Sequence, residues 1–167
     1  QGVRVKGVPT SKASAQLAGA LGIPLIDLNK VSRINITIDG SDECDPQFNL
    51  IKGGGGALTR EKLVALASEK RIIIVDESKL VDRLGVTRLL PVEVLPFAWT
   101  LSARLLRELG GEPHLRNAND EVFVTDNGNY ILDCNFGPIQ DPAELEKQIK
   151  LIPGVVENGL FIGIADV

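Results

Sequence analysis

The chain has very few of the residues that usually build metal or disulfide sites. It contains two cysteines and one histidine among 167 residues. Cys44 and Cys134 lie far apart and form neither a CxxC motif nor a disulfide framework, so we expect two free thiols, as in a reducing cytosol. His114 has no partner ligand and lies near no serine or cysteine, so neither a zinc site nor a nucleophilic triad is expected. Carboxylates alone could hold Mg²⁺, but our prediction is no metal and no cofactor.

Long apolar runs and a strong excess of one charge are also absent. No apolar run approaches the roughly 18 residues that a membrane-spanning helix needs, so we expect no membrane partner. The net charge is −4, which argues against broad binding of nucleic acid. No basic segment followed by an apolar one opens the chain, so no secretion signal is expected. With 44% hydrophobic and 24% charged residues, the composition is that of a folded rather than a disordered protein.

Strand-like and helix-like segments alternate over about the first 90 residues. Ser11 can cap a helix that closes at Gly22, and residues 23–28 are typical of a short strand. Isoleucines alternate with polar residues over 34–38 and predict a strand that ends at Asp39. A helix over residues 57–70 and a buried strand over 71–76 follow. This pattern predicts an α/β fold with a doubly wound, Rossmann-like parallel sheet, in which ligands bind beyond the carboxyl ends of the strands.

From Pro91 onward the pattern predicts a smaller α+β unit. A strand is followed by a helix with Leu101, Leu105 and Leu109 on one face. Two strands then flank Asn127-Gly128, the preferred pair of a type I′ hairpin. A helix capped by Asp141 and a strand over 155–164 complete a β-α-β-β-α-β order, which is ferredoxin-like. We therefore predict a Rossmann-like catalytic domain over 1–90, a ferredoxin-like domain over 91–162, and a return toward the first domain over 163–167.

The stretch DGSDECDPQFNLIKGGGGALTREK, residues 39–62, concentrates the candidate functional residues. Its glycine run is neither a Walker loop nor a GxGxxG motif. Because consecutive glycines lose much backbone entropy on folding, we expect their N–H groups to approach an anionic ligand. Asp39, Asp42 and Glu61 add carboxylates and Lys52 adds a cation, which together predict acid–base catalysis on an anionic small molecule. The structural alternatives are a flexible loop, an acidic surface turn and a solvated helix glutamate.

The motifs DGSDE and KGGGGALTREK closely resemble the signature of ribose-5-phosphate isomerase, type A. Further agreement comes from VPTSKAS, VDESK, LPVEVLPFA, LGGEP, TDNGNYILD and IPGVVENGLF, so the resemblance covers essentially the whole chain. It implies interconversion of ribose 5-phosphate and ribulose 5-phosphate in the pentose phosphate pathway, without a metal. It also implies a homo-oligomer, either a dimer or a tetramer, in the cytoplasm or in a plant plastid.

The resemblance implies a role for each candidate residue. Glu61 would be the base that moves a proton between C2 and C1 through a cis-enediolate. Lys52 would stabilise the enediolate oxygen, while Asp39 and Asp42 would hold hydroxyls and assist ring opening. The other substrate-binding residues that it implies are Gly40, Ser41, Gly53, Gly54, Gly55 and, on the phosphate side, Lys79.

One departure from the family is the absence of a TGSTA-like phosphate-binding loop. The sequence also starts at Gln1 rather than methionine and stops at Val167 within an apolar run, so we expect a fragment shortened at both ends. Two other functions stay open. One is a non-catalytic sugar-phosphate sensor, which could dispense with Glu61, and the other is a sugar-phosphate deaminase of similar fold.

Overall fold

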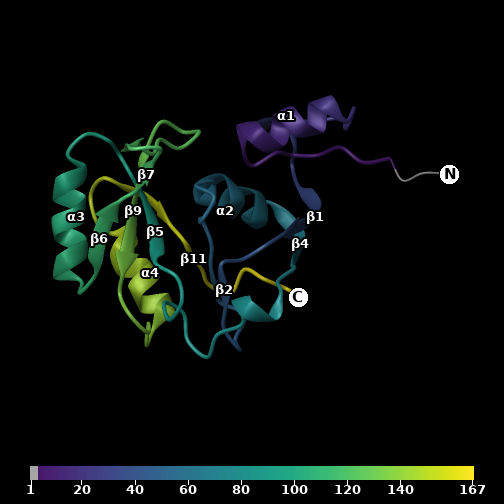
Figure 1. The fold of residues 1–167 in the computed structure, drawn as a ribbon. Helices are drawn as coiled ribbons and strands as arrows, with labels where there is room; N and C mark the ends of the chain where they lie inside the picture. The colour runs from purple at the N-terminus through teal and green to yellow at the C-terminus, as the bar shows by residue number, and fades with distance from the viewer. Residues whose placement is uncertain (1–3) are drawn as a thin grey trace.

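The structure is a computed structural model that describes residues 4–167, and its ribbon divides into two halves (Figure 1). One half carries the helices α1 and α2 with the strands β1 and β4. The other carries α3 and α4 with β5, β6 and β9. Within the described residues, no helix is both long and apolar enough to cross a membrane.

The first half is built around a parallel pair of strands. β1 (Ile34–Asp39) pairs in parallel with β4 (Ser68–Ile73), and α2 (Leu58–Leu66) contacts both strands. A short antiparallel sheet lies beside them in the order β11-β3-β2, made of Leu160–Phe161, Leu50–Ile51 and Glu43–Cys44. The predicted α/β class with a parallel sheet is confirmed, and so is the strand that ends at Asp39. Cys44 and Cys134 are free and buried, as expected.

The second half is a four-stranded antiparallel sheet in the order β10-β5-β9-β6. In chain order its elements are β5 (Leu90–Val94), α3 (Trp99–Glu108), β6 (Glu112–Leu115), β9 (Tyr130–Asn135), α4 (Pro142–Lys150) and β10 (Val155–Asn158). The predicted β-α-β-β-α-β order is present, but its second strand is β6 and not the segment expected before Asn127-Gly128, where Val124 forms only a single bridge to Tyr130. A small hairpin of β7 (Asn117–Ala118) and β8 (Glu121–Val122) is inserted between β6 and β9. The predicted domain boundaries at residues 90 and 162 stay a prediction.

The two faces of this sheet serve different purposes. Successive residues of a strand point to opposite faces, so Val92 and its partner Leu132 lie on one face and Glu93 and Asp133 on the other. The first face joins Leu106 of α3 in a buried hydrophobic cluster. The second face carries carboxylates, which bond to α2 and to the side chain of Arg116. The helices therefore cover one face of the sheet, and the other face supports the first half of the chain.

Several elements differ from the sequence prediction. Residues 23–28 are not a strand: Leu25 forms a single bridge to Gly7, and a short 3₁₀ helix, Leu28–Lys30, follows. The helix expected over 57–70 ends at Leu66, and the next strand begins at Ser68 rather than at residue 71. Good helix formers at 67–70 are overridden because this segment pairs with β1. The final strand is interrupted at Gly159, where β10 and β11 separate into different sheets.

Helix α1 (Lys12–Ala20) begins as predicted, with Ser11 as its N-cap. The leucine face expected for α3 is confirmed in part, because Leu105 and Leu109 pack partly buried against the core. Ala103 and Leu106 are buried, whereas Leu101 is 41% exposed. The cause is close packing on the turn after α4, where the Ser102 hydroxyl donates to the carbonyl of Pro153.

The difference in burial between the leucines of α3 can be tested by truncating two of them separately. We expect Leu106→Ala to lower the free energy of unfolding by about 2–5 kcal/mol, because it leaves a cavity in a closed core. Leu101→Ala should lower it by about 1 kcal/mol or less, since that side chain is already partly in water. Urea unfolding of both variants measures the difference. Equal losses would contradict the assignment of the buried face.

Candidate active site

Lys52, Asp39 and Glu61 form one ion-pair cluster. The Lys52 ammonium lies 2.9 Å from Oδ2 of Asp39 and 3.2 Å from Oε2 of Glu61. It also donates a hydrogen bond of 2.5 Å to the carbonyl of Gly40. The Lys52 side chain is only 5% exposed, and a lysine so buried is stable only when its charge is compensated. The structure thus brings together three of the four residues predicted to be catalytic.

Each member of the cluster is placed by a different element. β1 ends at Asp39, whose carbonyl accepts a hydrogen bond from Ile74 just beyond β4. Lys52 directly follows β3, and its backbone N–H donates to the carbonyl of Gly159. Glu61 lies in the first turn of α2, where the helix dipole favours a carboxylate. The glycine run between Lys52 and α2 turns the chain so that both side chains face the end of β1.

The electrostatic surroundings of Glu61 are those of a carboxylate that can accept a proton. Burial raises the pKa of Glu61 most strongly, and Lys52 opposes this by favouring the charged form. The carboxylates of Asp39 and Asp42 add a smaller upward effect on this pKa. Oε2 of Glu61 is buried and, apart from its ion pair with Lys52, receives no hydrogen bond within residues 4–167. An incompletely bonded carboxylate with a raised pKa is a suitable general base.

Asp42, the fourth predicted catalytic residue, is bound to the glycine run. The N–H of Gly54 donates to Oδ2 of Asp42 at 2.8 Å. A Cβ atom at position 54 would lie 2.7 Å from the other carboxylate oxygen, so a side chain there would displace the Asp42 carboxylate. The sequence prediction had all the loop N–H groups facing a ligand. In the structure the Gly54 N–H binds a carboxylate of the protein itself.

Arg116 is a residue of the site that sequence reasoning missed. Its Nη1 donates to the carbonyls of Gly53 at 2.9 Å and Gly54 at 3.1 Å. Its Nε and Nη2 form a bidentate pair with the carboxylate of Asp133 on β9. Nothing near Arg116 in the sequence signals this contact, because the glycine run lies more than 60 positions away.

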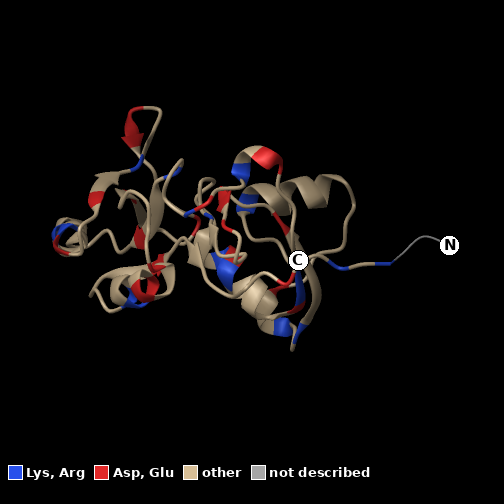
Figure 2. Cartoon of the chain, turned by 90° about the horizontal axis from the view of Figure 1, so that it is seen from below, with Lys and Arg blue, Asp and Glu red and all other residues tan. Residues whose placement is uncertain are grey.

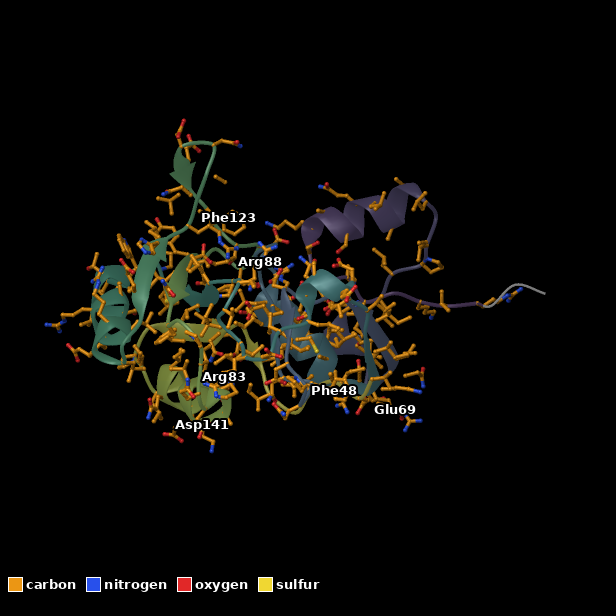
Figure 3. All side chains as sticks on the ribbon, turned by 60° about the horizontal axis from the view of Figure 1, so that its bottom comes forward. Phe48, Glu69, Arg83, Arg88, Phe123 and Asp141 are labelled. Carbon is orange, nitrogen blue, oxygen red and sulfur yellow. The ribbon has the colours of Figure 1, made fainter. Side chains whose placement is uncertain are left out.

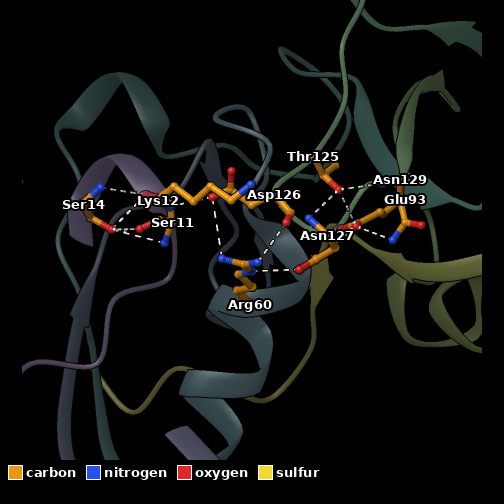
Figure 4. Close-up of polar contacts among 9 residues, drawn as sticks. All are labelled: Ser11, Lys12, Ser14, Arg60, Glu93, Thr125, Asp126, Asn127 and Asn129. Atoms are coloured by element: carbon orange, nitrogen blue, oxygen red, sulfur yellow. Dashed lines mark hydrogen bonds and ion pairs between the residues drawn. The ribbon is translucent and has the colours of Figure 1, made fainter. Parts of the chain in front are cut away.

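Glu93 is a second residue that the sequence did not reveal (Figure 4). Its carboxylate is fully buried and accepts a hydrogen bond of 2.5 Å from the hydroxyl of Thr59, in the first turn of α2. Three further donors reach it from the loop before β9, namely Thr125, Asn127 and Asn129. The same loop binds the guanidinium of Arg60 through Asn127 and the carbonyl of Asp126. The helix turn that carries Glu61 is therefore held through Thr59 and Arg60, the two residues that precede it.

Two other predicted residues have clear but different surroundings. The hydroxyl of Ser41 donates to the carbonyls of Glu43 and Ile51, so it holds the local backbone together. Lys79 ends the short 3₁₀ helix Glu77–Lys79 and is partly buried. In the described part of the chain, Lys79 makes no ion pair with the cluster around Lys52. Its role on the phosphate side stays a prediction.

Acidic and basic segments gather in the middle of the molecule, where the two halves meet (Figure 2). A groove of about 670 Å³ runs along β1 and includes Asp39, but neither Lys52 nor Glu61 lines it. Within residues 4–167, no three His, Cys, Asp or Glu side chains form a group suited to a metal ion. In this cluster the positive charge near the carboxylates comes from Lys52.

Comparison with known proteins points to a single family. Residues 6–167 match the family described as Ribose 5-phosphate isomerase A (phosphoriboisomerase A). The chain is 57% identical over 165 residues to ribose-5-phosphate isomerase A of Gloeobacter violaceus, a match that covers 98% of this chain and 72% of that protein. It is also 57% identical over 164 residues to the protein of the same name from a Synechococcus strain, covering 97% and 71% of the two chains.

Solved structures give the same result. A D-ribose-5-phosphate isomerase in complex with phospho-erythronic acid matches with a TM-score of 0.92 and 44% identity, over 96% of this chain and 71% of that one. Ribose 5-phosphate isomerase A from Methanocaldococcus jannaschii matches with a TM-score of 0.89 and 46% identity, over 94% and 70%. The similarity in sequence and in fold therefore extends over nearly all of this chain.

The electrostatic account of the cluster predicts how Glu61 titrates. We expect its pKa to lie above the ordinary value of 4.5, because burial opposes the charged form. Lys52→Met should raise the pKa of Glu61 further, since it removes the cation that stabilises the carboxylate. Lys147→Met, which removes an exposed cation of α4, is the control and should leave this pKa unchanged. A ¹³C NMR titration of the Glu61 carboxyl carbon measures all three, and a lower pKa in Lys52→Met would contradict the account.

Proposed function

The chain belongs to the ribose 5-phosphate isomerase A family, and we propose that it acts by enediolate proton transfer with Glu61 as the base. The resemblance found in its motifs is confirmed by the family match and by relatives that are more than half identical. Its activity is that of an aldose–ketose isomerase, interconverting D-ribose 5-phosphate and D-ribulose 5-phosphate. The observation that supports Glu61 as the base is that its Oε2 is buried 3.2 Å from the Lys52 ammonium and receives no hydrogen bond within residues 4–167.

The proposed reaction has two proton transfers at carbon. In the open-chain aldose, the carboxylate of Glu61 removes the proton from C2, and the electron pair moves through C1 onto the carbonyl oxygen. Glu61 then returns the proton to C1, while a proton passes from the oxygen on C2 to the oxygen on C1. The product has a ketone at C2 and a hydroxyl at C1. The raised pKa of Glu61 suits both steps, because the group must first accept and then release a proton.

The remaining residues act on oxygen rather than on carbon. We assign to Lys52 the stabilisation of the negative oxygen of the enediolate, because its ammonium lies 3.2 Å from the carboxylate of the proposed base. We assign ring opening and the binding of sugar hydroxyls to Asp39 and Asp42. Gly40, Ser41 and Gly53 to Gly55 contribute the backbone around the sugar, and Lys79 is assigned to the phosphate side.

Two alternatives to this function have less support from the site. A non-catalytic sugar-phosphate sensor has no need of a buried carboxylate base. In this chain Glu61 is partly buried and burial raises its pKa, an arrangement typical of catalysis. A sugar-phosphate deaminase could use a similar base, but the family match is to the pentose isomerase.

The proposal also includes a homodimer or homotetramer, a cytoplasmic or plastid location and independence from metals.

The role of Glu61 can be tested by its neutral isostere. We expect Glu61→Gln to lower kcat for ribulose 5-phosphate formation by about 100- to 10,000-fold, the usual contribution of a general base. The variant should keep the fold, because Asp39 and the carbonyl of Gly40 still bind the Lys52 ammonium. A coupled assay on the longest native form of the chain, with urea unfolding, measures both. Glu108→Gln on α3 is the exposed control, and near-native turnover by Glu61→Gln would refute the assignment.

A further inference from the structure

Arg116 links the sheet of the second half to the glycine run of the first. Its guanidinium uses three nitrogens for four hydrogen bonds, two to backbone carbonyls of the run and two to the carboxylate of Asp133. The Arg116 side chain is 15% exposed, so these bonds are largely shielded from water. A bidentate guanidinium–carboxylate pair fixes both position and orientation, which makes Arg116 a rigid support for the loop.

This support determines where the loop N–H groups point. In a trans peptide group the carbonyl and the following N–H point in opposite directions. Arg116 binds the carbonyl of Gly53, so the N–H of Gly54 points away from the guanidinium, and there it meets Asp42. A continuous chain of contacts therefore runs from Asp133 through Arg116 and one peptide group to a residue assigned to the sugar.

The next peptide group is oriented in the same way. Arg116 also binds the carbonyl of Gly54, so the N–H of Gly55 likewise points away from the guanidinium. Among residues 4–167 the Gly55 N–H has no acceptor, and Gly55 is exposed with open space around its Cα. That N–H can donate to an oxygen of a small molecule bound beside Asp42.

A second side chain limits the movement of the loop. Phe123, labelled in Figure 3, lies at the base of the β7–β8 hairpin. The Arg116 guanidinium lies 5.7 Å from the centre of its ring, and the ring occupies the space that a Cβ at Gly56 would need. Gly56 itself has a φ of 82°, which a residue with a side chain rarely adopts. Arg116 and Phe123 together hold both ends of the glycine run.

We propose that Arg116, anchored by Asp133, is a positioning residue for the isomerisation, which it serves by orienting the Gly53–Gly54 and Gly54–Gly55 peptide groups. This inference rests on the function proposed above. Peptide groups between glycines rotate easily once their carbonyls lose their hydrogen-bond donors. The orientations of the Asp42 carboxylate and of the Gly55 N–H therefore depend on the guanidinium. Hydrogen-bond donors positioned in this way act mainly on the transition state. Loss of Arg116 should therefore lower kcat more than it changes KM.

The test compares Arg116→Gln with Arg71→Gln. Arg71 forms the same bidentate pair with Asp166, but it contacts no residue of the glycine run, so it controls for loss of an Arg–Asp pair. We expect Arg116→Gln to lower kcat on the order of 10- to 100-fold, with KM changed by less than about 3-fold. Arg71→Gln should change kcat by less than about 2-fold. Arg116→Lys should not restore kcat, because one ammonium cannot bind two carbonyls and a carboxylate bidentately.

A second readout does not depend on turnover. The amide proton resonances of Gly54 and Gly55 should shift in Arg116→Gln and stay in place in Arg71→Gln. If Arg116→Gln fails to fold, Asp133→Asn keeps the guanidinium and removes its anchor, and it should give a smaller loss of kcat with the same amide shifts. Unchanged kcat and unchanged amide resonances in the folded variants would overturn the inference. An inactive wild-type protein would instead count against the proposed function, and the amide shifts would still decide the role of Arg116.

Discussion

The ion pairs of Lys52 with Asp39 and Glu61 are the constraint on which the rest of the site depends. A buried ammonium requires compensation, and here it comes from the end of β1 and the first turn of α2. These elements must therefore meet at one point, which accounts for the sharp glycine turn between Lys52 and the helix. In the described part of the chain, the same arrangement leaves Oε2 of Glu61 with its ion pair to Lys52 and no hydrogen bond. The residues that compensate the buried charge are thus the same residues to which we assign the proposed proton transfer.

The second half of the chain contributes to the site although it supplies none of the predicted catalytic residues. The strand alternation of its sheet places apolar side chains toward α3 and α4, and it places Glu93 and Asp133 toward the first half. Glu93 holds the first turn of α2 through Thr59, and Asp133 holds the glycine run through Arg116. Glu93 is fully buried and is stable only when fully bonded, so its bond to Thr59 helps to fix the two halves against each other.

The parts of the site that were predictable from sequence are those encoded locally. Asp39, Lys52 and Glu61 lie within one short stretch, so a strand end, a glycine turn and a helix start were enough to suggest that they meet. Arg116 and Glu93 were not predictable, because their partners lie 63 and 34 positions away and depend on how the sheets pack. In the fold, too, local features were predictable from sequence and features that depend on tertiary contacts were not. The order of elements in the second half follows local patterns, whereas the end of α2 and the buried face of α3 are set by tertiary contacts.

The central claim is that a carbon-bound proton passes through the carboxylate of Glu61. It is tested most directly by running the isomerisation of ribose 5-phosphate in D₂O and locating deuterium in the product by NMR. Because the Glu61 side chain is 17% exposed, a proton held on it can exchange with solvent before it is returned. The account predicts deuterium at C1 of ribulose 5-phosphate. Complete transfer of the original C2 hydrogen to C1, with no solvent deuterium in the product, would contradict it.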